Sequence, residues 1–222
     1  MGEGVAAGPE GLREMFPVLL LVLLAQGVLA QRVRRPYFCA EGDECYSFIT
    51  ICRDSEYETR AYEPSVWIGS VVYPNEERYR AIDRLRDYFN QKNQPGIQIE
   101  KTVPQVTRYQ YLDRKPIATV VYMMLPRRFQ RNPPLPTNTM VFLTQFPALT
   151  MFVKTTRSWL TSLLPHAQEL LEDLLRQSEA FIADRFYIAE YSGPLTILNR
   201  HNEIWYLSSG YPLCASRYSR WS

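Results

Sequence analysis

The chain has 222 residues, of which 46% are hydrophobic and 22% are charged, and its formal net charge is only +2. A chain of this length is long enough to bury the core of a single domain. Bases and acids are mixed along the sequence, so the charge pattern does not indicate a nucleic-acid-binding protein.

Residues 15–30 contain a short apolar run that is typical of a secretory signal peptide. Its uninterrupted part is too short to cross a hydrocarbon core of about 30 Å. Val28 and Ala30 are small enough for a signal peptidase, which predicts cleavage before Gln31. We expect residues 1–30 to be a signal peptide, with an uncleaved signal anchor as the alternative. The leader holds one base and three acids, so the mature chain would have 24 bases, 20 acids and a net charge of +4.

Four cysteines follow the leader, and an even number in an exported chain predicts disulfides. Cys45 and Cys52 end an alternating run that would hold their Cα atoms about 23 Å apart as a strand, whereas a disulfide needs less than about 7 Å. Cys39 and Cys45 flank a short polar loop that can close, so they are the favoured pair. Cys52 and Cys214 form either a second bridge or two buried thiols. Residues 31–44 are expected to be an N-terminal arm whose basic cluster at residues 32–35 is solvated, with a processing site as the alternative.

The stretch that organises the fold is residues 57–72, which alternates apolar and polar side chains as a half-buried strand does. It follows a shorter strand predicted at residues 46–51. Pro64 interrupts the long strand because proline has no amide hydrogen to donate. Residues 141–156 have the same character, with Pro147 at the interruption. This repetition predicts an internal duplication.

An amphipathic helix is expected after the first long strand, starting at residues 75–77 with Asn75 as a favourable N-cap. Its apolar side chains recur at spacings of three and four, which gives one buried face. Pro and Gly within residues 93–96 end it. The rest of the first copy is predicted to be an extended segment at residues 97–106, a polar hairpin region at 108–115 and an apolar strand at 117–125.

A proline-rich crossing at residues 126–139 leads into the second copy. Each copy has the order strand, helix, strand, strand, without the rhythm of a parallel α/β sheet. The sequence therefore predicts an α+β fold in which duplicated β-α-β-β units form a distorted antiparallel β-barrel with two helices packed outside. The second copy is expected to comprise a strand at residues 140–155, a helix at 158–181, and strands at 185–190, 196–199 and 203–208.

No catalytic signature is present, since the sequence contains no HExxH, CxxC, GxSxG or Walker motif. We therefore expect neither enzymatic activity nor a dedicated metal site. His166 and His201 are interpreted as surface or capping residues, with metal or heme ligation as the alternative. The arginines of the first helix form either a solvated face or a clamp for carboxylates or phosphates.

Four segments carry a family resemblance: residues 57–67, YETRAYEPSVW; residues 99–104, IEKTVP; the proline-rich crossing with the second long strand; and residues 202–205, NEIW. Together they resemble the SOUL heme-binding protein family. The resemblance extends over residues 45–208, so residues 45–222 are interpreted as one SOUL domain. Lys101 departs from the pattern, because the family usually has methionine there.

The resemblance implies that heme or a related tetrapyrrole binds in an apolar depression beside the first helix, without catalysis and without an invariant axial ligand. In some members the helix supplies a base near the porphyrin propionates, and Arg80 corresponds to it. The candidate pocket residues are Tyr79, Arg80, Ile82, Arg84, Arg86 and Phe89.

The function expected from the sequence is thus a secreted, extracellular carrier of heme or another porphyrin, with no nucleic-acid partner and no membrane span after cleavage of the signal peptide. The alternative is a secreted protein-interaction module that retains the fold but has lost tetrapyrrole binding. A third possibility is that the ligand is another flat apolar molecule, such as a bile pigment.

Overall fold

The computed structural model describes residues 36, 38–39, 44–112, 115–158, 163–192 and 200–214. The predicted signal peptide, its cleavage site and the strand predicted at residues 196–199 lie outside the described residues. No helix within the described part of the chain is long and apolar enough to span a membrane.

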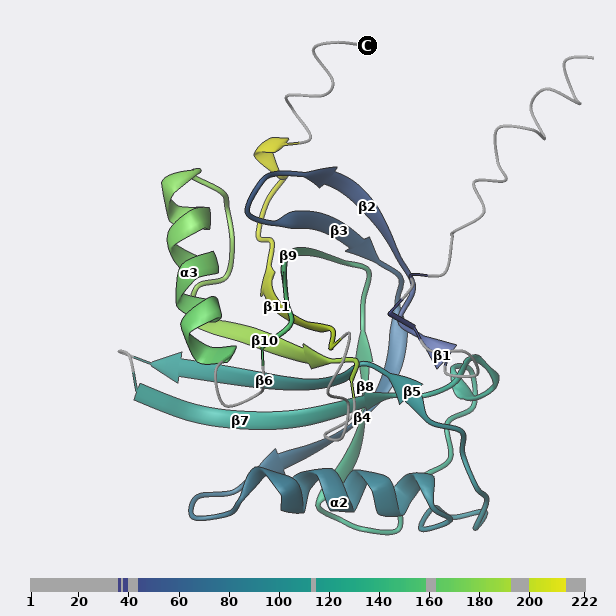
Figure 1. Ribbon diagram of the computed structural model, residues 1–222. Helices are drawn as coiled ribbons and strands as arrows, with labels where there is room; N and C mark the ends of the chain where they lie inside the picture. The colour runs from purple at the N-terminus through teal and green to yellow at the C-terminus, as the bar shows by residue number, and fades with distance from the viewer. Residues whose placement is uncertain are drawn as a thin grey trace, which may run out of the picture. The chain divides into compact units, whose positions relative to one another are not determined.

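The elements follow one another in the order that the duplication predicts (Figure 1). Before the second copy, these are β1 (Glu44–Cys45), β2 (Phe48–Arg53), β3 (Glu58–Tyr62), β4 (Ser65–Val72), α2 (Arg78–Phe89), β5 (Thr102–Val103), β6 (Gln105–Leu112), β7 (Lys115–Met124) and a 3-10 turn, η1 (Arg127–Phe129). The second copy contains β8 (Val141–Phe146), β9 (Leu149–Thr156), α3 (Leu163–Arg176), β10 (Arg185–Glu190) and β11 (Asn202–Leu207).

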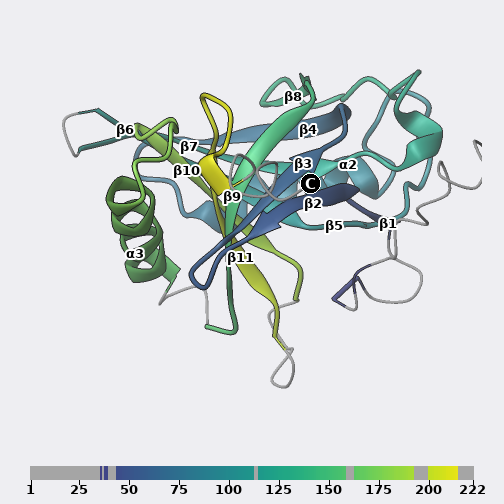
Figure 2. The same ribbon diagram turned by 90° about the horizontal axis from the view of Figure 1, so that it is seen from above.

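Nine strands form one antiparallel sheet in the order β2-β3-β9-β11-β10-β6-β7-β4-β8. From β3 to β8 the order is symmetric, because exchanging β3 with β8, β9 with β4, β11 with β7 and β10 with β6 reverses it. This symmetry confirms the duplicated unit. The sheet curls into a half-barrel (Figures 1 and 2), so the predicted barrel is present in an open form. A separate two-stranded sheet pairs β1 with β5 in parallel.

Both long strands break where the prolines predict. Glu63 and Pro64 separate β3 from β4, and Pro147 lies in the gap between β8 and β9. The break lets one continuous segment leave one part of the sheet and join another: β3 pairs with β9, whereas β4 pairs with β7 and β8. These corners give the sheet its curl.

The helices are shorter than the sequence predicts. Asn75 does not cap α2; it adopts a left-handed conformation with φ of 64°, and the helix begins at Arg78. Asparagine tolerates this conformation better than most residues, so Asn75 forms a turn instead. The helix α3 ends at Arg176, five residues before the predicted end, and Ser178 has a φ of 57°.

Each helix buries its apolar face against the sheet. Leu85 and Tyr88 of α2 contact Ile68 and Val121, whereas α3 packs through a second cluster. The inside of the half-barrel is filled by a third cluster around the fully buried Trp67. The interior is therefore a packed core. The cluster through which α3 packs comprises Tyr57, Phe152, Leu163, Ala167, Leu170, Leu174, Phe186, Ile188, Ile204 and Tyr206.

Two disulfides link the chain to itself. Cys39–Cys45 is the pair that the short loop favours, with Cα atoms 6.0 Å apart. Cys52–Cys214 joins β2 to the C-terminal end of the described chain, with Cα atoms 6.1 Å apart. Of the two states left open for Cys52 and Cys214, the structure therefore has the bridge.

Candidate functional site

A cavity of about 420 Å³ lies beside α2. It is bounded by α2, by β5 and by the adjoining ends of β6, β7 and β10, which the sheet order brings together. The residues that line it are Arg78, Ile82, Arg86, Phe89 and Asn90 from α2 and its end; Lys101, Thr102 and Val103 from β5 and the residue before it; Gln105, Met123 and Glu190 from the large sheet; and Tyr191, Ser192 and Arg200 from the connection between β10 and β11.

One face of α2 forms a wall of the cavity. Arg78, Ile82, Arg86 and Phe89 follow one another at intervals of four, four and three residues, which places them on one side of an α-helix. Ile82 and Phe89 contribute apolar surface, and Met123 adds more from the sheet. The surface that lines the site is mainly apolar, although most of the lining residues also carry a polar or charged group.

Two arginines of this wall have different electrostatic roles. Arg78 binds Glu190 through both terminal nitrogens, at 2.6 and 3.2 Å, so its charge is compensated within the wall. Arg86 is exposed, and its only described carboxylate partner, Asp83, lies at 3.4 Å. A ligand can therefore engage Arg86 without breaking a buried ion pair.

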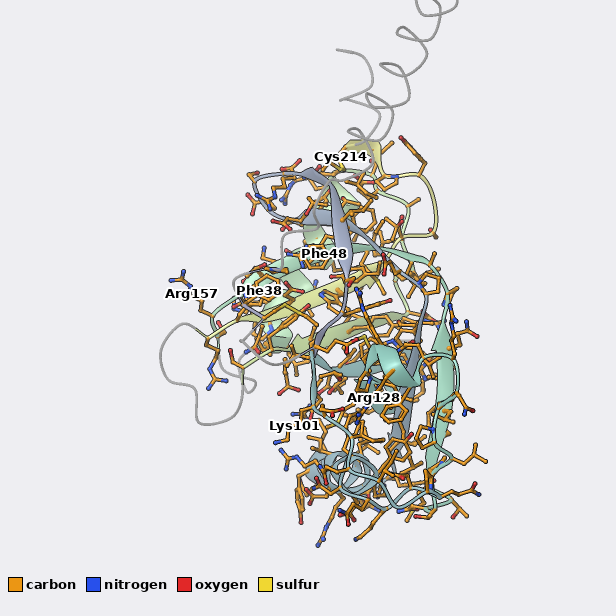
Figure 3. The ribbon with its side chains drawn as sticks, turned by 90° about the vertical axis from the view of Figure 1, so that its right-hand side faces the viewer. Phe38, Phe48, Lys101, Arg128, Arg157 and Cys214 are labelled. Atoms are coloured by element: carbon orange, nitrogen blue, oxygen red, sulfur yellow. A yellow bond between two sulfur atoms is a disulfide. The ribbon has the colours of Figure 1, made fainter. Side chains whose placement is uncertain are left out.

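Lys101 is the second available cation. It is exposed and has no hydrogen bond or ion pair within the described residues. In Figure 3 it lies at the edge of the molecule, between Phe38 and α2. Lys101 and Arg86 both line the cavity, which gives its rim a positive charge suited to carboxylates.

The structure brings three of the six candidate pocket residues to the cavity: Ile82, Arg86 and Phe89. Tyr79 is 49% exposed, and the Arg80 guanidinium lies over its ring at 5.0 Å from the centroid. Neither residue lines the cavity. Successive helical residues are rotated by about 100°, so Arg80, two positions from Ile82, faces another direction.

Arg84 is held on the sheet side of α2. Its guanidinium donates to the hydroxyl of Ser70 at 2.8 Å and to the carbonyl of Val71 at 2.7 Å, and it pairs with Glu76. These contacts join α2 to β4 and to the turn before the helix. Arg84 is therefore committed to the fold and does not line the cavity.

The walls formed by β5 and by the β10–β11 connection were not predicted. They approach α2 only through the sheet pairing, which periodicity does not reveal. Lys101 is the exception, since its departure from the usual methionine of the family motif marked it in the sequence.

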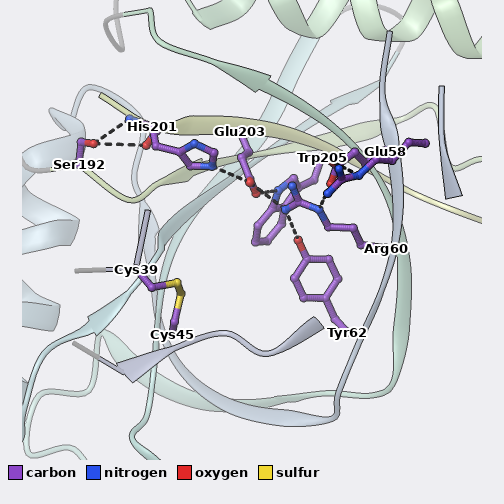
Figure 4. A network of polar contacts seen from close by, with 10 residues as sticks. Cys39, Cys45, Glu58, Arg60, Tyr62, Ser192, His201, Glu203 and Trp205 are labelled. Carbon is purple, nitrogen blue, oxygen red and sulfur yellow. Dashed lines mark hydrogen bonds and ion pairs between the residues drawn. A yellow bond between two sulfur atoms is a disulfide. The ribbon is translucent and has the colours of Figure 1, made fainter. Parts of the chain in front are cut away.

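A buried polar network lies inside the half-barrel (Figure 4). Glu203 is fully buried, and one of its carboxylate oxygens accepts from Arg60 at 2.8 Å and contacts His201 at 2.8 Å. The indole nitrogen of Trp205 donates to the other oxygen at 2.7 Å. Arg60 also donates to Glu58 at 2.7 Å. Each oxygen of Glu203 therefore already has a partner.

The network keeps Glu203 ionised. Burial alone would raise the pKa of this carboxyl, but the charge of Arg60 and the contact with His201 outweigh it and lower the pKa below its ordinary value. Nearby, burial raises the pKa of Tyr191 well above 10, and the charge of Glu203 raises it further. The arrangement fits a structural ion pair.

Neither histidine lines the cavity. His201 is buried and contacts Glu203, and the ring of Phe38 stacks on it with centroids 3.7 Å apart. His166 lies on α3 and contacts Glu169. Within the described residues, no group of three or more His, Cys, Asp or Glu side chains could hold a metal ion.

Ser158, His166 and Glu169 form a hydrogen-bonded series, with Ser158 Oγ 2.9 Å from His166 Nε2 and His166 Nδ1 3.0 Å from the carboxylate. The catalytic triad of serine hydrolases has the same order of serine, histidine and acid, but in that triad the acid is buried. Glu169 is half exposed and also contacts Lys154 at 3.5 Å. The series fits a surface contact that fastens residue 158 to α3.

Comparison with known sequences gives a consistent family. The profile of the SOUL heme-binding protein family matches residues 43–207. Heme-binding protein 2 of Mus musculus is 28% identical over 164 residues, which are 70% of this chain and 80% of that protein. Heme-binding protein 2 of Homo sapiens is 27% identical over the same length and shares.

Solved structures share the fold at low sequence identity. The crystal structure of the EcmrR C-terminal domain has a TM-score of 0.52 at 13% identity, covering 70% of this chain and 99% of that chain. The cryo-EM structure of an EcmrR–DNA complex has a TM-score of 0.53 at 11% identity, covering 89% of this chain and 68% of that chain. These likenesses concern the fold alone.

Proposed function

Because the chain belongs to the SOUL heme-binding protein family, we propose that it binds heme or a related tetrapyrrole in the cavity beside α2, as a carrier and not as an enzyme. The observation that carries this proposal is the apolar cavity with two exposed cations at its rim. The cavity volume of about 420 Å³ lies within the range of small-molecule pockets. The cavity also lies beside the first helix, where the sequence led us to expect a ligand.

Apolar burial supplies the main driving force in this proposal. A porphyrin is flat and mostly apolar, and Ile82, Phe89 and Met123 provide matching surface. Its two propionates meet Arg86 and Lys101 at the rim. Each exposed ion pair contributes only about 0.2–1 kcal/mol, so the cations orient the ligand more than they hold it.

Reversing both rim charges should weaken heme binding without disturbing the fold. In the variant Arg86→Glu/Lys101→Glu, two weak attractions become repulsions, so we expect Kd to rise about fivefold to thirtyfold. The measurement is a heme titration followed by Soret absorbance. Arg80→Glu is the matched control: it has the same charge change on the same helix but lies off the cavity, so Kd should stay within about twofold.

The same titration separates the alternatives. Loss of binding in Arg80→Glu alone would place the ligand on the other side of α2. His166→Ala and His201→Ala should each leave Kd within a few-fold, since neither side chain lines the cavity. Competition by metal-free porphyrin tests the need for iron, and competition by a bile pigment tests the third possible ligand. A wild-type protein without saturable binding would favour the interaction module.

We also propose that the chain is exported. The two disulfides are consistent with an oxidising compartment, and the apolar leader ends in small residues before Gln31. N-terminal sequencing of protein secreted by cultured cells should give the sequence QRVRR. Recovery of the full-length chain in the membrane fraction alone would contradict cleavage.

A further inference from the structure

The Cys39–Cys45 disulfide joins two segments that rest on two different walls of the cavity. We refer to Phe38, Cys39, Glu44 and Cys45 as the disulfide clamp. On one side, Glu44 and Cys45 form β1, which pairs with Thr102 and Val103 of β5. Both β5 residues line the cavity.

The β5 wall is held by β1, by β7 and by the core cluster around Trp67, against which Val103 packs. It has only two residues, and β1 is its partner in the small sheet. The amide of Tyr46 extends this pairing by donating to the carbonyl of Val103 at 3.0 Å. Thr102 adds one side-chain bond, to the carbonyl of Met124 at 2.6 Å. A short element of this kind is fixed largely by what covers it.

On the other side, Phe38 packs against the connection between β10 and β11. Its ring stacks on His201 at 3.7 Å and meets Tyr191 edge-on at 4.7 Å. The amide of His201 donates to the hydroxyl of Ser192 at 2.8 Å. Tyr191 and Ser192 line the cavity, so Phe38 supports the wall formed by the β10–β11 connection.

We propose that the disulfide clamp holds these two walls together and that its reduction weakens ligand binding, which makes the site redox-sensitive. The inference rests on the proposed function of the cavity. Once the bond is cleaved, Phe38 is joined to β1 only through the main chain between them, and the short cross-link is lost. The walls then lose a shared restraint, and the ligand must order them on binding.

The two disulfides differ in exposure, which makes selective reduction feasible. Cys52 and Cys214 are both buried, at 5% and 7% exposure, whereas Cys45 is only partly buried. Thiol–disulfide exchange requires access of a thiolate to one sulfur. A small dithiol would attack Cys45, releasing the Cys39 thiolate, and its second thiol would then displace Cys45. The protein gains two thiols and the dithiol becomes a cyclic disulfide.

The test compares three oxidised proteins: the wild type, Cys39→Ser/Cys45→Ser and Cys52→Ser/Cys214→Ser. Hydrogen exchange of the Tyr46, Tyr191 and His201 amides reports the walls without any ligand. In the clamp variant we expect these amides to exchange at least about tenfold faster, as local opening becomes easier, and heme Kd to rise about threefold to tenfold as the walls must be ordered. The second variant should leave these amides and Kd close to wild type.

Unchanged exchange at all three amides in the clamp variant would overturn the proposal, and so would an unchanged heme Kd in a wild type that binds heme. A wild type that binds no heme would instead reject the function proposed for the cavity, while the exchange data would still decide the clamp. If Cys52→Ser/Cys214→Ser does not fold, Phe38→Ala replaces it. With the disulfide intact, that variant should speed exchange at Tyr191 and His201 but not at Tyr46.

Partial reduction of wild type with dithiothreitol, followed by alkylation, should label Cys39 and Cys45 first. Labelling of Cys52 and Cys214 first would contradict the selectivity.

Discussion

Replacing Arg60 by alanine is expected to lower the free energy of unfolding by about 3–5 kcal/mol, because it leaves a buried carboxylate without its cation. Arg60 is 2% exposed and Glu203 is fully buried, with 2.8 Å between guanidinium and carboxylate. His201 and Trp205 would remain as hydrogen-bonding partners of Glu203 among the described residues. Urea denaturation at neutral pH measures the loss.

Arg53→Ala is the matched control. Arg53 pairs with Glu58 at 3.0 Å, as Arg60 does at 2.7 Å, but its side chain is 70% exposed. A pair in water contributes at most about 1 kcal/mol, so this variant should lose much less stability. Equal losses in the two variants would contradict a large contribution from the buried pair of Arg60 and Glu203.

The pH dependence identifies the responsible group. In the native state Arg60 and His201 lower the pKa of Glu203 despite its burial. A glutamate in the unfolded chain has a pKa of about 4.3. Its contribution is therefore present above that pH and is lost as pH falls through the native pKa. Without Arg60, burial raises the pKa of Glu203, so acid should reduce the difference between wild type and Arg60→Ala. A difference that stays constant from neutral to acid pH would exclude Glu203 as the cause.

This ion pair also shows what sequence reasoning reached and where it stopped. Arg60 belongs to the opening YETRAYEP segment and Glu203 to the closing NEIW segment, the two motifs that identified the family. Each was recognised by itself. Their contact follows from the sheet order, in which β9 lies between β3 and β11, and no periodicity in either segment encodes that order.

The fold was predictable because its signals are local and repeated. Pro64 and Pro147 mark the same corner in both copies, and a proline in a strand has few other interpretations. The pocket depends on helix phase and on distant strands. A shift of two residues along α2 turns one side of the helix into another. Arg86 lines the cavity, whereas Arg84, two residues earlier, is bound to Ser70.

The second large effect is expected from Cys52→Ser/Cys214→Ser, which should lower the free energy of unfolding by about 3–5 kcal/mol. The cysteines are 162 residues apart, so the bond closes almost the whole described domain into one loop and restricts the unfolded chain. It also ties the edge strand β2 to the C-terminal end, where Cys214 contacts Thr59 at 3.3 Å. Urea denaturation under oxidising conditions measures the change.

The Cys39–Cys45 disulfide supplies the control for this mechanism. Cys39 and Cys45 are only six residues apart, and closure of so short a loop stabilises by about 2 kcal/mol. Because the unfolded chain expands once the long loop opens, the denaturant m-value should also rise in Cys52→Ser/Cys214→Ser and change little in Cys39→Ser/Cys45→Ser. If the short-loop variant lost as much stability as the long-loop variant, with equal m-values, the stabilisation would come from packing around the sulfurs. Restriction of the unfolded chain instead predicts that Cys52→Ser/Cys214→Ser has both the larger loss of stability and the larger m-value.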